Sequence, residues 1–427
     1  MRHILLATTG ESPQVVTETL YGMHKENQPW PDAIRIITTT LGAKRAREGL
    51  LEQGHIKRLC DEIARPLPQF SETDIRIVPD AQGAPVDDAR SVEDHEALAD
   101  FIINQLRDLT ADADTTVHAS LAGGRKTMTF YLGYAMSLFG RVQDTLSHVL
   151  ISKGYESHPQ FWYPSADPTP LTGRDDKPLT HVDGSPMRAG DAKVTLASIP
   201  FIRQREELPS LLRNAGDAVH FRSLVRLFNL ADQPEDIRLT LDFAERHINL
   251  EDARGQMRPV KLRPDRLDFA FYAMMARATL REDKSIKRPS ERTPNETLLK
   301  LYLDELLPIF GLPPEERAVD ALDALEDWND NHQAIPDKTL LTLRGEKARI
   351  SKDSKGHEIV NHEPVRAIGM THTWFDARKN ALKELFQTHL PSRLLERLLP
   401  RALNERGKDG KKLPYRIYLS PDSIKLD

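Results

Sequence analysis

The amino-acid sequence predicts an α/β fold: a Rossmann-like domain with a mostly parallel sheet, then an α-rich region with winged-helix character. Short apolar, β-branched runs alternate with helical patterns up to about residue 205, and polar turns separate them. Helical spacing then dominates from about residue 206 onward. We therefore predict two regions, 1–205 and 206–427.

The strands of the first region are expected at residues 3–8, 33–40, 74–80, 115–120, 144–152 and 193–203. Pro200 places the last of them at a sheet edge. The first helix is expected to have Ser12 as its N-cap and Pro13 at its first position. The helix before the fourth strand is expected to begin with a capping box from Ser91 to Asp94.

Two segments depart from this alternation. Residues 161–191 are rich in Pro, Gly and Asp and are too long for an ordinary connection, so they are either a functional loop or a disordered insertion. We hypothesise that residues 164–191 form a lid, with Arg174, Lys177, His181 and Arg188 facing a polyanion. In the second region, residues 406–422 and 350–360 each resemble a hairpin or wing.

Composition limits the classes of function. The 427 residues carry a net charge of −5, so any polyanion site must be a local concentration of positive charge. Cys60 is the single cysteine, which excludes intrachain disulfides and argues against a cysteine-built zinc site. No stretch approaches the roughly 20 apolar residues of a membrane span, and residues 1–10 read as a strand. We expect a cytoplasmic protein.

Two loops at predicted strand ends contain the candidate site. The first is TTGESPQVVTE after the first strand, and the second is SLAGGRKT after the fourth strand. Glycines allow close backbone approach, and the N–H groups at a helix start favour an anion. Arg125 and Lys126 add cations suited to phosphate, while Thr9 and Ser12 add hydroxyls. The alternative is a helix cap with solvated charges. Neither common nucleotide-binding fingerprint is present.

These motifs resemble a known family. The segments ILLATTGESPQVVTETLYGM, SLAGGRKTMTFYLGYAMSLFGR, SHVLIS and VTLASIPFIR are similar to those of CRISPR-associated Rossmann-fold (CARF) proteins, in particular the ring nucleases of type III systems. The resemblance covers roughly residues 1–205. It implies a homodimer that binds cyclic oligoadenylate, usually the tetra-adenylate, across its two-fold axis and cleaves it to end the antiviral signal.

The resemblance assigns catalytic roles to Ser12, Arg125 and Lys126. The ligand-binding positions that we expect around them are Thr9, Gly10, Glu11, Gly123, Gly124 and Thr127. A ribose 2′-hydroxyl can attack its own 3′-phosphate when it is held in line and cations cover the developing charge. This reaction requires no metal or cofactor. No general base is evident, because His118 reads as a packing residue and Glu11 either polarises a hydroxyl or is solvated.

Rival functions concern the second region. Many CARF proteins carry a ribonuclease with an R-x(4–6)-H signature, and the spacing recurs at Arg213–His220 and at Arg366–His372. The alternative function is therefore a ribonuclease or regulator activated by cyclic oligoadenylate. RNA or DNA binding is a further possibility, because residues 401–427 hold seven Lys/Arg against four acidic residues. We expect Tyr415 and Tyr418 to belong to the core.

Overall fold

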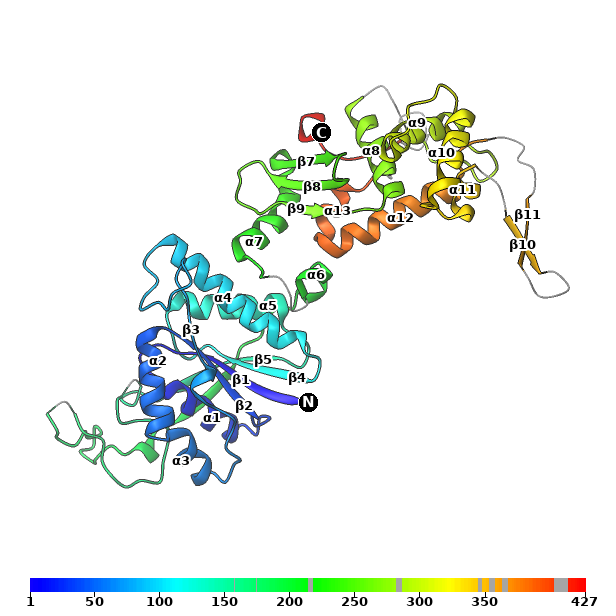
Figure 1. Cartoon of the computed structure of the whole chain (residues 1–427). Helices are drawn as coiled ribbons and strands as arrows, with labels where there is room; N and C mark the ends of the chain where they lie inside the picture. Colours follow the sequence, from blue (N-terminus) through cyan, green and yellow to red (C-terminus); the bar gives the residue numbers. More distant parts are fainter. Residues whose placement is uncertain are drawn as a thin grey trace, which may run out of the picture. The chain divides into compact units, whose positions relative to one another are not determined.

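The computed structural model describes residues 1–156, 158–173, 175–213, 218–281, 286–344, 348–352, 358–362, 368–402 and 414–427. The chain forms two compact units, shown with their elements in Figure 1. The first contains Met1–Leu208 and Leu212–Arg222, and the second contains Pro209–Leu211 and Ser223–Asp427. The boundary predicted after residue 205 lies just before this division.

A six-stranded sheet forms the centre of the first unit. Its strands are β1 (Arg2–Thr8), β2 (Ala33–Thr38), β3 (Ile75–Ile77), β4 (Thr115–Ser120), β5 (Thr145–Ile151) and β6 (Val194–Ser198). They lie in the order β3-β2-β1-β4-β5-β6. The first five are parallel, whereas β6 runs antiparallel to β5 at the edge. The predictions of a mostly parallel sheet and of an edge position for the last strand are confirmed.

Helices cover the sheet on both faces. They are α1 (Gln14–Lys25), α2 (Thr40–Ala46), α3 (His55–Glu62), α4 (Val92–Ala111) and α5 (Lys126–Phe139). Leu5 and Ala7 of β1 pack with α1, α2 and α3 in one apolar core. Helices α4 and α5 pack against each other and lie together in Figure 1. Because the five parallel strands share one direction, their carboxyl ends meet along one edge of the sheet.

Two helix starts test the expected caps. The backbone N–H of Asp94 donates to the hydroxyl of Ser91 (3.0 Å), and the N–H of Ser91 donates to the carboxylate of Asp94 (3.1 Å), so the capping box is confirmed. The expected cap at Ser12 is wrong: α1 begins at Gln14 after Pro13, and no side chain caps it. Pro13, with helical dihedral angles, occupies the N-cap position instead of Ser12, and proline has no side-chain oxygen that could accept a hydrogen bond from the first turn.

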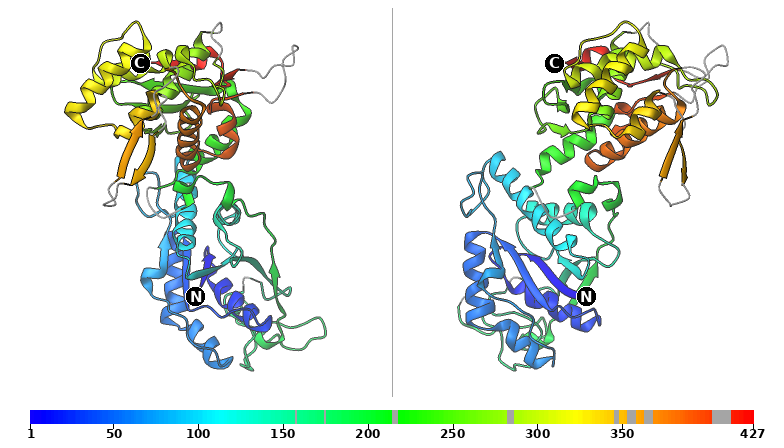
Figure 2. Two further views of the ribbon diagram at one scale, coloured as in Figure 1. Left: turned by 90° about the vertical axis from the view of Figure 1, so that its right-hand side faces the viewer. Right: turned by 45° about the vertical axis from the view of Figure 1, so that its right-hand side comes forward.

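The long segment after β5 has structure of its own. It contains three isolated β-bridges, and Tyr155, Phe161, Leu171 and Met187 belong to a small separate core. In Figure 1 and in the left view of Figure 2 it projects from the first unit as a green loop. The contacts of the expected cations are local: Lys177 pairs with Asp175, His181 lies near Asp191, and Arg188 donates to the carbonyl of Pro168. Arg174 lies outside the described residues, and the lid stays a prediction.

The second unit combines a sheet with a helical layer. Its sheet has the order β14-β7-β8-β9 and consists of β7 (Ile237–Asp242), β8 (His247–Asp252), β9 (Val260–Leu262) and β14 (Ile424–Leu426). The helices after β9 are α8 (Arg266–Leu280), α9 (Glu296–Leu306), α10 (Ala318–His332), α11 (Asp337–Arg344), α12 (His372–His389) and α13 (Ser392–Leu398), and α6 (Ser210–Arg213) and α7 (Phe221–Asn229) precede β7. The sequence predicted the helices but missed the sheet.

Two antiparallel strand pairs match the hairpins expected in the second region. The first joins β10 (Ala348–Lys352) to β11 (Glu358–His362), and the second joins β12 (Arg401–Ala402) to β13 (Tyr415–Arg416). The turn of each pair lies outside the described residues. Tyr415 packs edge-on against Phe375, as expected of a core residue. The ring of Tyr418 instead contacts the guanidinium groups of Arg401 and Arg416. The winged helix stays a prediction.

Candidate functional site

The loops that follow β1 and β4 meet at the carboxyl edge of the sheet. The hydroxyl of Thr8 donates to the carbonyl of Gly123 (2.7 Å), which ties the two loops together. A Cβ atom on Gly123 would lie 2.9 Å from a methyl group of Val15, and Gly124 has a φ of +96°. Side chains are poorly tolerated at both positions, so the two glycines allow the loops to touch and leave backbone N–H groups near the edge.

The two adjacent cations in the second loop have different surroundings. Lys126 is the first residue of α5 and is exposed, and its ammonium group has no ion-pair or hydrogen-bond partner among the residues that the structure describes. Arg125 precedes the helix, and its Nε lies 2.8 Å from Oδ1 of Asp88. Lys126 is therefore a free cation beside the N–H groups of a helix start, where an anion binds favourably. Arg125 must exchange a carboxylate for any incoming phosphate.

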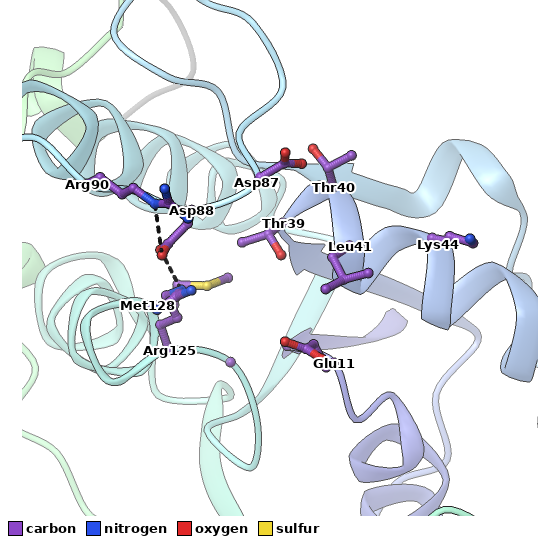
Figure 3. Close-up of a pocket in the computed structure, with 12 residues that line it drawn as sticks. Glu11, Thr39, Thr40, Leu41, Lys44, Asp87, Asp88, Arg90, Arg125 and Met128 are labelled. Carbon is purple, nitrogen blue, oxygen red and sulfur yellow. Dashed lines mark ion pairs between the residues drawn. The ribbon is translucent and has the colours of Figure 1, made fainter.

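A first cavity of about 720 Å³ opens on the side of β2 and β3 (Figure 3). Its lining includes three carboxylates and three cations, namely Glu11, Asp87, Asp88, Lys44, Arg90 and Arg125. Asp88 lies between Arg125 and Arg90, and the Arg90 Nε is 3.6 Å from Oδ2 of Asp88. Leu41 and Met128 add apolar surface. The cavity thus contains cations that can bind phosphate, carboxylates that can accept hydrogen bonds from a ligand, and an apolar surface that can pack against an apolar face of a ligand.

A second, smaller cavity of about 130 Å³ lies between α1, β5 and the loop after β4. Ser12, Gln14 and Glu18 line it together with His148 and Glu156. Glu18 is 5% exposed, and burial, assisted by the charge of Glu156, raises the pKa of its carboxyl group to about 7. The side-chain carbonyl oxygen of Gln14 is buried and lacks a hydrogen-bond partner among the described residues.

The structure divides the predicted site residues between these cavities. Gly10, Glu11, Gly124 and Arg125 line the first cavity, whereas Ser12 lines the second. Gly123, Lys126 and Thr127 line neither; they lie in the loop and in the first turn of α5.

Thr9 has a place of its own. It is fully buried, and its hydroxyl has no hydrogen-bond partner among the described residues. Its carbonyl accepts a hydrogen bond from the hydroxyl of Thr38 (2.8 Å), which fixes the first loop to β2. Thr9 thus lines neither of the two cavities, and its role in ligand binding stays a prediction.

His118 has the packing role that the sequence indicated. It lies on β4, and its Nε2 is 2.7 Å from the hydroxyl oxygen of Ser147, while its Nδ1 is 3.2 Å from that of Thr145. Burial lowers the pKa of its imidazole to about 4, so the ring is neutral at physiological pH. Both ring nitrogens are thus engaged by hydroxyl groups of the neighbouring strand.

Several residues of the two cavities were not predicted. Asp87, Asp88 and Arg90 follow β3, and Lys44 belongs to α2 after β2. Their position after the ends of parallel strands was the available signal, because the same rule had selected the loops after β1 and β4. Glu18 lacked such a signal, since its burial depends on how α1 packs against β5 and β6.

The proposed ribonuclease signatures in the second half have other contacts. Arg213 pairs with Glu206 (2.8 Å), and His220 lies 2.7 Å from a carboxylate oxygen of Asp100. Residues 214–217 and Arg366 lie outside the described part, and His372 begins α12. The described residues contain no cluster of His, Cys, Asp or Glu that could hold a metal ion. No helix among them is long and apolar enough to cross a membrane.

Comparison with models of protein families identifies the family of the chain. A model of the family described as CRISPR-associated protein NE0113 matches residues 12–228, half of the chain. The chain belongs to this NE0113 family. The matched part begins at Ser12 and includes the loop with Arg125 and Lys126, so CRISPR association is confirmed. No curated protein is significantly similar to this NE0113-family chain.

Proposed function

We propose that this NE0113-family protein is a ring nuclease that binds cyclic oligoadenylate, most simply cyclic tetra-adenylate, and cleaves it to end type III CRISPR signalling. The observation that carries the proposal is Lys126 at the start of α5, where two glycine loops meet and its ammonium group has no partner in the described part of the chain. A CRISPR-associated family provides the context in which such a cyclic messenger occurs. The resemblance to CARF proteins gives the ligand class.

The proposed reaction is attack by a ribose 2′-hydroxyl on its own 3′-phosphate. Lys126 and the N–H groups of the first turn of α5 cover the phosphate oxygens, on which negative charge develops. Arg125 binds a neighbouring phosphate once that phosphate displaces Asp88. Ser12, which lines the second cavity, orients the reacting ribose or phosphate. The products are linear oligoadenylates that end in a 2′,3′-cyclic phosphate.

The ring is proposed to bind across two copies of the chain. A cyclic tetranucleotide has internal symmetry, which a two-fold pair of identical loops can match. Phe130 and Tyr134 of α5 are 59% and 37% exposed, directly beyond the phosphate-binding end of the helix. Exposed aromatic side chains in such a place are typical of a protein interface. This surface supports a homodimer with one ring per dimer.

A sensor that controls an effector is the second candidate function. It is favoured by the second unit, which has its own sheet and its own apolar core and so could act as a separate module. Under this alternative the loops bind the ring without cutting it. The second unit then cleaves RNA or contacts another macromolecule when the ring is bound.

One experiment separates these functions. Purified protein is incubated with cyclic tetra-adenylate in EDTA, the products are separated by chromatography, and ring binding is measured in parallel. Linear products support the ring nuclease, whereas an intact ring with tight binding supports the sensor. A fluorescent RNA reporter, tested with and without the ring, then shows whether the second unit is a ribonuclease. An intact ring that does not bind contradicts both proposals.

A further inference from the structure

A buried carboxyl group lies in the cavity that contains Ser12. Glu18 is on α1, one helical turn after Gln14, and the side chains of both line the second cavity. The carboxyl group of Glu18 has neither an ion-pair nor a hydrogen-bond partner among the described residues. Burial of an unpaired carboxylate costs roughly several kcal/mol. The position of Glu18 therefore calls for an explanation other than stability.

The other groups around the cavity define what it can bind. The titratable side chains that line it with Glu18 are His148 on β5 and Glu156 in the segment after β5. Among the described residues that line it, none is a lysine or arginine. The side-chain carbonyl oxygen of Gln14 has no hydrogen-bond partner within the described ranges. The polar atoms of the cavity are mostly hydrogen-bond acceptors, so its complementary occupant is a donor such as a hydroxyl group.

The reaction proposed above supplies such a donor. We propose that the carboxylate of Glu18 is the proton acceptor for the attacking 2′-hydroxyl, which enters the second cavity beside Ser12. This inference rests on the proposed function. The O–H bond of the hydroxyl breaks and its proton passes to Glu18, while the 2′-oxygen forms a bond to phosphorus. The bond from phosphorus to the 5′-oxygen then breaks, and that oxygen takes a proton from water.

Two other groups fit this role less well. His118 has both ring nitrogens close to hydroxyl oxygens of β5 and lines neither cavity. Glu11 is exposed and lines the first cavity, whereas Ser12 lines the second. Glu18 shares the cavity with Ser12 and is shielded from water, which gives its carboxylate a stronger basicity than an exposed one has.

The ionisation of Glu18 agrees with this role. Burial and the neighbouring charge of Glu156 raise the pKa of its carboxyl group from 4.5 to about 7. A general base is most effective when its pKa is close to the working pH, because it is then both ionised and basic. Glu156 thus acts on the reaction through Glu18, as a positioning residue. Its negative charge raises the pH at which Glu18 loses its proton.

The test is the pH dependence of single-turnover cleavage of cyclic tetra-adenylate. In the wild-type protein the rate should rise with pH and level off above about 7. Glu18→Gln should lower the rate by about 10²- to 10⁴-fold, remove the rise with pH and leave ring binding nearly unchanged. Glu26→Gln, at the exposed end of α1, is the matched control and should behave as wild type.

A second variant avoids changing Glu18 itself. Glu156→Gln removes a negative charge beside it, so the rise of the rate should move to lower pH while the plateau remains. Cleavage by Glu18→Gln at the wild-type rate, or an unmoved pH profile in Glu156→Gln, overturns the role of Glu18 and leaves the ring nuclease standing. A wild-type protein that does not cleave the ring overturns both.

Discussion

Replacing Glu18 by glutamine should make the stability of the first unit less dependent on pH. Burial raises the pKa of the carboxyl group from 4.5 to about 7. Each pH unit between the two values corresponds to about 1.4 kcal/mol, so ionised Glu18 destabilises the folded unit by about 3 kcal/mol. Glutamine has the same shape and cannot ionise. The variant should therefore lack this destabilisation at every pH.

The direction follows from proton binding. Below pH 4.5 the carboxyl group is protonated in both the folded and the unfolded chain. Between pH 4.5 and about 7 the unfolded chain loses this proton and the folded chain keeps it, so the free energy of unfolding falls as pH rises. Above about 7 both forms are ionised and the loss is complete. The difference between Glu18→Gln and wild type should grow across this window and then stay constant.

The single cysteine provides the assay. Cys60 is free and buried in the core of the first unit, so its reaction with a dithiodipyridine in increasing urea reports unfolding of that unit within the full chain. Relative to wild type, the free energy of unfolding of Glu18→Gln should increase by about 3 kcal/mol as pH rises from 4.5 to 8. That of Glu26→Gln should show no such increase. If the free energies of unfolding of Glu18→Gln and wild type differ by the same amount at all pH values, the claim that Glu18 is a buried, ionisable carboxyl group is refuted.

Three further predictions concern the loops and the interface. Lys126→Ala should lower single-turnover ring cleavage by about 10²- to 10³-fold and weaken binding less, because its cation acts mainly on the transition state; unchanged cleavage would exclude this role. Asp88→Asn should release Arg125 and tighten ring binding by up to about fivefold, since the ion pair is partly exposed, and isothermal titration showing weaker binding would contradict it. Light scattering at micromolar concentration should show a ligand-free dimer, and a monomer would end the shared-site model.

Part of the fold could be predicted because local patterns determine it. The strands of the first unit are short apolar runs, and the capping box from Ser91 to Asp94 is a local hydrogen-bond pattern. The sheet of the second unit was missed although part of its signal is local. Buried and more exposed residues alternate along β7 and β8, which pair with each other in antiparallel fashion. The pairing of β14 with β7, from the far end of the chain, has no local signature in the sequence.

The candidate site shows the same limit. Arg125 and Lys126 were found from their type and position, but no local pattern indicates that Asp88 pairs with only one of them. It also placed Ser12 with both cations, whereas the structure assigns Ser12 and Arg125 to different cavities. The roles of Asp88 and Glu18 depend on contacts between segments far apart in the chain. Local spacing cannot reveal such contacts.

The most direct test of the account is single-turnover incubation of the full chain with cyclic tetra-adenylate in the presence of EDTA, followed by mass spectrometry of the products. The account predicts linear oligoadenylates that end in a 2′,3′-cyclic phosphate, formed by wild type and nearly absent with Lys126→Ala. Recovery of the intact ring from the wild-type protein, or products that end in a 3′-phosphate with no cyclic intermediate, would contradict it.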